Sequence, residues 1–92
     1  MDKEKVIKFL ESLGISTEGE FDENRYIVEL KDSDEWARYY SVFAENPDFE
    51  LSEASSMSQE FASVLTYVSD EYRIGLNANF DDNYYTISVE EN

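Results

Sequence analysis

The chain has 92 residues, the size of one domain, and it carries 22 Asp and Glu residues against 7 Lys and Arg residues. Its formal net charge of −15 argues against direct binding to a nucleic-acid backbone and against attachment to an anionic membrane surface. Seven Tyr, six Phe and one Trp distinguish it from disordered acidic tails, so we expect one folded domain over residues 1–92.

The residue types also exclude most catalysis. The chain has no His and no Cys, which removes Ser-His and Cys-His couples, thiolate nucleophiles and the usual ligands of zinc, copper and haem. Carboxylate-only chemistry stays formally open, but a domain of this size leaves little room for a water-excluding cleft. We therefore expect no enzyme activity, no cofactor and no bound metal. The lack of Cys, of an apolar leader and of any apolar run near ~20 residues indicates a cytoplasmic protein.

The first predicted element is a helix over residues 3–13. Its apolar positions are Val6, Ile7, Phe9, Leu10 and Leu13. Asp2 precedes it as an N-cap, and Gly14 follows where a left-handed residue is expected. Ile15 can then pack back on the last turn as the hydrophobic contact of a Schellman ending.

A ten-residue pattern, F-D-[DE]-N-x-Y-x-[VI]-x-[LV], occurs at residues 21–30 and again at residues 80–89. In each copy an Asp/Asn cluster separates two runs of alternating side chains, which predicts a β-hairpin with a short loop. Convergent turn chemistry and duplication of a hairpin both explain the pattern. Neither turn has the Gly and the Glu of a calcium-binding EF-hand loop.

A second helix is predicted to begin at Asp32. Asp32 as N-cap and Glu35 three residues later form a capping-box pattern, and the pair Asn46-Pro47 ends the helix. The side chains expected on its buried face are Trp36, Tyr40 and Phe43.

Three further strands are expected. Residues 49–53 alternate, and residues 72–80 alternate most clearly, with apolar side chains at every second position. Residues 61–68 fit both a helical stripe and a strand. We favour the strand, because the polar turn at residues 69–71 leads directly into the next one.

Together these elements predict an α+β fold, an antiparallel sheet of five or six strands with two helices packed on one face. The other face is expected to be wet. The polar positions expected there are Glu29, Lys31, Arg73, Asn77, Asn79, Thr86, Ser88 and Glu90, together with exposed Tyr84 and Ile27.

Clusters of acidic residues are the candidate partner-binding sites. If residues 16–21 form the outgoing arm of the first hairpin, Glu18, Glu20 and Asp22 project from one side at intervals of roughly 6.6 Å, commensurate with a row of phosphates. Each cluster taken singly also fits a solvated turn. Tyr39, Tyr84 and Tyr85 are amphipathic side chains that fit either an interface or a core. The candidate partner-binding residues are Glu18, Glu20, Asp22, Glu23, Glu50, Glu53, Asp70, Glu71, Asp81, Asp82 and Tyr84.

In size, charge and the acidic clusters at residues 18–23 and 80–83, the chain resembles the small acidic inhibitors encoded by phages and mobile elements, including anti-CRISPR, anti-restriction and uracil-glycosylase inhibitor proteins. The resemblance implies a protein that occupies the place of DNA or RNA on a nuclease.

We therefore expect a non-enzymatic inhibitor, monomer or homodimer, that binds a basic nucleic-acid-binding surface of a nuclease or Cas-type effector in the host cytoplasm. Two alternatives stay open: an immunity protein or antitoxin that neutralises a basic toxin, and an acidic adaptor or scaffold domain, including one whose charge reflects adaptation to salt.

Overall fold

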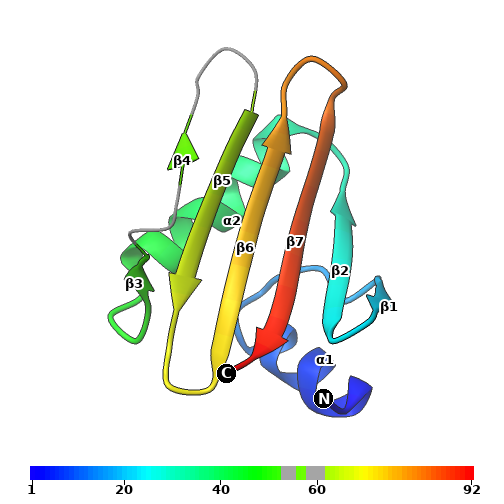
Figure 1. Cartoon of the computed structure of the whole chain (residues 1–92), viewed down its shortest axis with the longest axis vertical. Coiled ribbons are helices and arrows are strands. Elements are labelled where there is room, and N and C mark those ends of the chain that lie inside the picture. Colours follow the sequence, from blue (N-terminus) through cyan, green and yellow to red (C-terminus); the bar gives the residue numbers. More distant parts are fainter. Residues whose placement is uncertain (53–55, 58–61) are drawn as a thin grey trace.

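The computed structural model describes residues 1–52, 56–57 and 62–92. In chain order, the elements are α1 (Lys3–Ser12), β1 (Glu20–Asp22), β2 (Arg25–Leu30), α2 (Ser33–Glu45), β3 (Glu50–Leu51), β4 (Ser56–Met57), β5 (Ala62–Val68), β6 (Tyr72–Asn79) and β7 (Tyr84–Glu91). The predicted α+β fold, an antiparallel sheet with two helices, is confirmed (Figure 1).

Within the described residues, six strands follow the order β1-β2-β7-β6-β5-β3, and every pairing is antiparallel. The two-residue strand β4 pairs with β5 on the same edge as β3. The last strand, β7, therefore lies in the middle of the sheet between β2 and β6. The strand preferred for residues 61–68 is confirmed as β5, and residue 61 lies outside the described residues.

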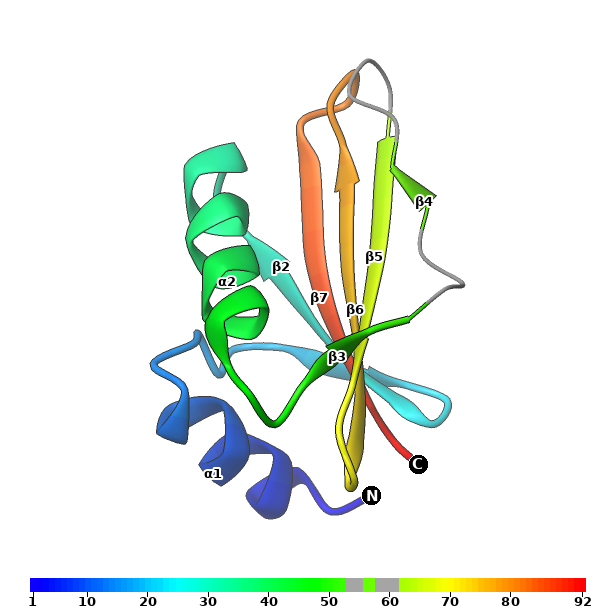
Figure 2. The same ribbon diagram turned by 90° about the vertical axis from the view of Figure 1, so that its left-hand side faces the viewer.

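Both helices lie on one side of the sheet (Figure 2). Every second side chain of the long strands points toward this side, because successive side chains of a strand point to opposite faces. The resulting core includes Tyr26, Val28 and Leu30 of β2, Leu65 and Tyr67 of β5, Tyr72, Ile74 and Leu76 of β6, and Tyr85, Ile87 and Val89 of β7.

Helix α1 has the ends that the sequence predicts. The Asp2 carboxylate accepts a hydrogen bond from the Glu4 N–H at 3.0 Å. Gly14 has a φ of 71°, and the Ile15 N–H donates to the Leu10 carbonyl at 3.0 Å, which is the bond of a Schellman ending. Ile15 and Leu10 are both buried, so the ending also fixes the start of the next segment against the core.

Helix α2 begins at its predicted cap, where the Asp32 carboxylate accepts from the Glu35 N–H at 2.9 Å. The Glu35 carboxylate accepts in turn from the Lys31 N–H at 3.2 Å, one residue before the cap itself. The predicted face of α2 packs on the core: Phe43 is buried, and Trp36 and Tyr40 are half-buried against it. Tyr39, which was not predicted on this face, is buried as well. The Tyr39 hydroxyl accepts a hydrogen bond from the Ser16 N–H at 3.2 Å, which satisfies it in this buried position.

Each copy of the repeated pattern ends in a strand of the sheet, β2 in the first copy and β7 in the second. The turns before these two strands differ. In the first hairpin Asp22 pairs with Arg25, and the turn has two residues, of which Glu23 has a φ of 57°. In the second hairpin Asn79 pairs with Tyr84, so the turn spans residues 80–83 and Asn83 has the positive φ, 49°. The left-handed residue thus falls at different positions of the pattern, which favours convergent turn chemistry over duplication.

The face of the sheet away from the helices is less exposed to solvent than the sequence predicts. Thr86 and Ser88 point to this face from the middle strand, yet they are only 6% and 9% exposed. Neighbouring strands cover them, since Ser88 lies beside Gly75 and the Asn77 amide donates to the Thr86 hydroxyl at 3.4 Å.

The edge strand predicted at residues 49–53 is shorter in the structure. It appears as β3, Glu50–Leu51, followed by a hydrogen bond from the Ser52 N–H to the Thr66 carbonyl at 2.7 Å. Glu53 lies outside the described residues.

Candidate partner-binding groove

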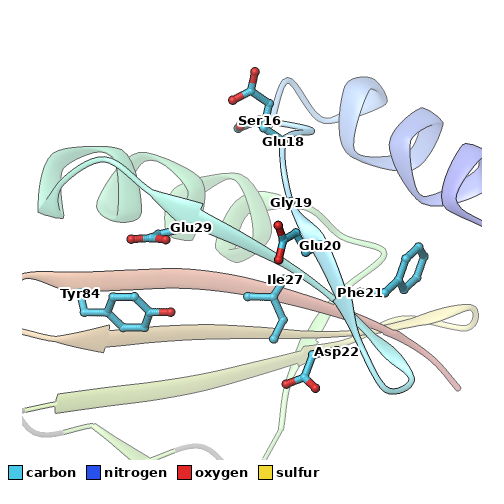
Figure 3. Close-up of a pocket in the computed structure, with 9 residues that line it drawn as sticks. All are labelled: Ser16, Glu18, Gly19, Glu20, Phe21, Asp22, Ile27, Glu29 and Tyr84. Carbon is cyan, nitrogen blue, oxygen red and sulfur yellow. The ribbon is translucent and has the colours of Figure 1, made fainter.

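A groove of about 720 Å³ lies on the open face of the sheet, beside the β1–β2 hairpin (Figure 3). Its lining residues are Ser16, Glu18, Gly19, Glu20, Phe21, Asp22, Ile27, Glu29 and Tyr84. Three separate parts of the chain contribute to it: the segment before β1 with β1 itself, β2, and the start of β7.

Strand register places the carboxylates around an apolar floor. Glu20 pairs with Ile27 and Asp22 pairs with Arg25, so these side chains project from the same face of the sheet. Glu29 follows Ile27 by two residues on β2 and shares that face. In Figure 3, Ile27 lies among Glu20, Asp22, Glu29 and the ring of Tyr84.

Two buried tyrosines fix the segment that leads into the groove. The Tyr26 hydroxyl donates to the Thr17 carbonyl at 2.6 Å, and the Tyr39 hydroxyl accepts from the Ser16 N–H at 3.2 Å. Gly19 approaches β2 so closely that a Cβ there would lie 3.1 Å from the Tyr26 ring and would collide with the Ile27 carbonyl oxygen.

This geometry corrects the predicted ladder of three carboxylates. Strand β1 begins only at Glu20, so residues 16–19 are not part of the outgoing arm. Glu18 is exposed and lines the groove, but Figure 3 shows its side chain near Ser16, away from Ile27. The carboxylates that share one face are Glu20 and Asp22 of β1 and Glu29 of β2.

The groove is strongly negative. Of its nine described lining residues, four carry a carboxylate and none carries a basic group. The Arg25 guanidinium lies 3.9 Å from the Asp22 carboxylate, and the two side chains are 47% and 65% exposed. An exposed pair at this distance neutralises little of the field.

The other predicted partner-binding residues do not all gather at this groove. Glu23 lies in the turn of the same hairpin, and Glu50 lies on β3. Asp70 and Glu71 form the turn before β6, whereas Asp81 and Asp82 form the turn after it, at the other end of the sheet (Figure 1). Eight strand residues separate these turns, or roughly 26 Å at 3.3 Å per residue.

Of the three tyrosines considered for an interface, two lie in the core and one lies in the groove. Tyr39 and Tyr85 are buried in the core, while Tyr84 is 51% exposed and lies in the groove. Sequence reasoning missed Ile27 and Glu29 as members of the site, although it placed both on the open face. The missing information is the cross-strand register, which brings Ile27 beside Glu20.

In the part of the chain that the structure describes, no group of three or more Asp and Glu side chains is placed to hold a metal ion. No helix in the described ranges is long and apolar enough to cross a membrane. Comparison with protein-family models, curated proteins and solved structures finds no match to this chain.

Proposed function

We propose that this chain is a non-enzymatic inhibitor that binds the basic, nucleic-acid-binding surface of a nuclease or Cas-type effector by nucleic-acid mimicry. The observation that carries the proposal is the groove beside the β1–β2 hairpin, which bears four carboxylates and no basic group in a chain of net charge −15.

The spacing of the carboxylates fits the mimicry. Glu20 and Asp22 are two residues apart on β1, so their Cα atoms lie about 6.6 Å apart, close to twice the ~3.4 Å axial rise per phosphate of one DNA strand. Lys and Arg side chains that bind a row of phosphates would therefore meet carboxylate acceptors at about twice the axial rise per phosphate. Ile27 and the exposed Tyr84 add an apolar surface for the methylene stems of those side chains.

The charge of the whole chain supports the same partner. A dense negative field accelerates association with a basic surface and makes the complex sensitive to ionic strength. Cationic nucleic-acid-binding grooves are prominent basic surfaces in a cell, so they are the partners that such a field selects first.

Affinity capture tests the proposal. The immobilised chain is incubated with lysate of its source cell, and separately with a panel of nucleases and Cas effectors, at 50 and 500 mM salt. We expect a basic nucleic-acid-binding protein to be retained at 50 mM salt, to be released at 500 mM, and to be displaced by DNA. Retention of acidic or neutral proteins alone, or of none, would refute the proposal.

A matched pair of variants tests the groove itself. The double variant E20Q/D22N keeps side-chain shape and removes two charges from the groove, and we expect it to weaken binding of the captured enzyme about tenfold. The variant E11Q/E45Q removes two exposed charges from the helices, so its affinity should stay close to that of the parent chain. Equal losses for both variants would mean that overall charge, and not the groove, determines binding.

A further inference from the structure

A second hollow, of about 570 Å³, lies where α1, the segment before β3 and the turn between β5 and β6 meet. It is lined by Phe9, Pro47, Asp48, Phe49, Ser69, Asp70, Glu71 and Tyr72. None of these residues lines the groove beside the β1–β2 hairpin, so the two concave surfaces are separate.

Aromatic rings form the walls of this second hollow, which we call the aromatic hollow. The ring centroids of Phe9 and Tyr72 are 4.2 Å apart, and those of Phe9 and Phe49 are 6.2 Å apart. Phe43 packs edge-on against Phe49 at 5.1 Å and fixes it from the core side. Phe9 and Phe49 remain half-buried, so part of each ring is available to a ligand.

Carboxylates form the rim. Asp48, Asp70 and Glu71 are all exposed, and they come from two different segments of the chain. The pKa of the Tyr72 phenol is raised, first because the ring is buried. Lys5 opposes this rise, while Glu71 of the rim and Glu91 outside it add to it. An aromatic wall under a negative rim is complementary to a cation with an apolar stem.

The chain already places one ammonium group against this wall. Lys5 Nζ lies 5.8 Å from the centroid of the Tyr72 ring and 3.4 Å from the Glu91 carboxylate. Lys5 does not line the hollow, so it leaves the rings of Phe9 and Phe49 and the three rim carboxylates to another ligand.

We infer that the aromatic hollow binds a lysine side chain of the partner, with its methylene stem on Phe9 and Phe49 and its ammonium group at Asp48, Asp70 and Glu71. The partner's basic character rests on the proposed function. Lysine fits better than arginine, because a compact ammonium with three donors suits carboxylates that arrive from separate segments, whereas a planar guanidinium favours one bidentate partner.

A small probe tests the site without the partner protein. Nα-acetyl-lysine methylamide and its uncharged analogue Nα-acetyl-norleucine methylamide are titrated into the chain, and the ring protons of Phe9 and Phe49 are followed by NMR. We expect saturable shifts with the lysine probe and an affinity at least fivefold lower for norleucine. Absence of saturable shifts, or equal affinities for the two probes, would overturn the inference.

Variants separate this site from the groove. D70N/E71Q should weaken the lysine probe about fivefold, because two exposed charge contacts are lost, while E20Q/D22N removes the same charge elsewhere and should leave it unchanged. Equal losses in both variants would overturn the inference, since overall charge would then explain the binding. Capture of a basic enzyme by a chain that does not bind the probe would refute the hollow and leave the proposed function standing. The converse result would refute the inhibitor and leave the lysine site.

Discussion

Gly19 and Gly75 both lie where an added methyl group would meet a neighbouring strand, but the atoms it would meet differ. At Gly19 the nearest atoms are the carbonyl oxygen and carbon of Ile27, which belong to the backbone of β2. At Gly75 the nearest atom is the hydroxyl oxygen of Ser88, 2.5 Å away, and this side chain can rotate to another rotamer. The same substitution therefore has different consequences at the two positions.

We predict that Gly19→Ala lowers the free energy of unfolding by about 1–3 kcal/mol, because the segment that leads into β1 must move away from β2 to admit the methyl group. Gly75→Ala should cost less than about 1 kcal/mol, since Ser88 can move. Urea unfolding measures both values. In the background of Ser88→Ala, Gly75→Ala should cost almost nothing, while Gly19→Ala should keep its full effect. A loss of stability close to zero for Gly19→Ala would contradict the close approach of this segment to β2.

At the scale of single elements, the turn of the first hairpin contains a residue that is poorly suited to its backbone. Glu23 has a φ of 57°, in the left-handed region that costs most residues roughly 1–2 kcal/mol. The turn of the second hairpin places Asn83 in that region, and Asn tolerates it much better.

The variant Glu23→Asn should therefore stabilise the domain by roughly 0.5–1 kcal/mol, measured as an increase in the free energy of unfolding in urea. Glu23→Gln is its matched control, because it removes the same charge without easing the backbone. Equal stabilisation by Asn and Gln would show that relief of charge repulsion, and not turn geometry, is the cause.

Elements with signals inside a short window could be predicted from the sequence. Asp2 and Gly14 mark the two ends of α1, and strand β6 alternates over its whole length. The sequence alone leaves β5 ambiguous, because residues 61–68 fit two periodicities. Its pairing with β6, from Ala62 beside Asn79 to Val68 beside Arg73, selects the strand.

The candidate site could be predicted only in part, because its members meet through register and long-range contacts. Alternation placed Ile27 on the open face, but only the pairings of β2 with β1 and β7 show which residues surround it. The buried Tyr39 hydroxyl is hydrogen-bonded to the backbone of Ser16, 23 residues earlier. Neither relation leaves a signal in a local sequence window.

At the scale of the whole molecule, charge acts on stability and on binding in opposite ways. The chain measures 35 × 25 × 24 Å, and at ~0.01 M salt the screening length of ~30 Å lets carboxylates repel across its full width. At ~0.1 M salt the screening length is ~10 Å, so only near neighbours interact. Exposed ion pairs, such as Lys5–Glu91 at 3.4 Å, offset little of this repulsion.

We therefore predict that raising NaCl from 10 to 500 mM stabilises the isolated domain by on the order of 1 kcal/mol, or about 4–8 °C in Tm for a chain of this size. Calorimetry in chloride measures the effect, because sulfate would also act through exclusion from the protein surface. Over the same range, binding to a basic partner should weaken, since the same screening reduces attraction. A Tm that falls with salt would mean that attractive pairs outweigh self-repulsion. If Tm rises while affinity falls, dissociation at 500 mM NaCl cannot be attributed to unfolding, and the charge of the folded surface is what holds the partner.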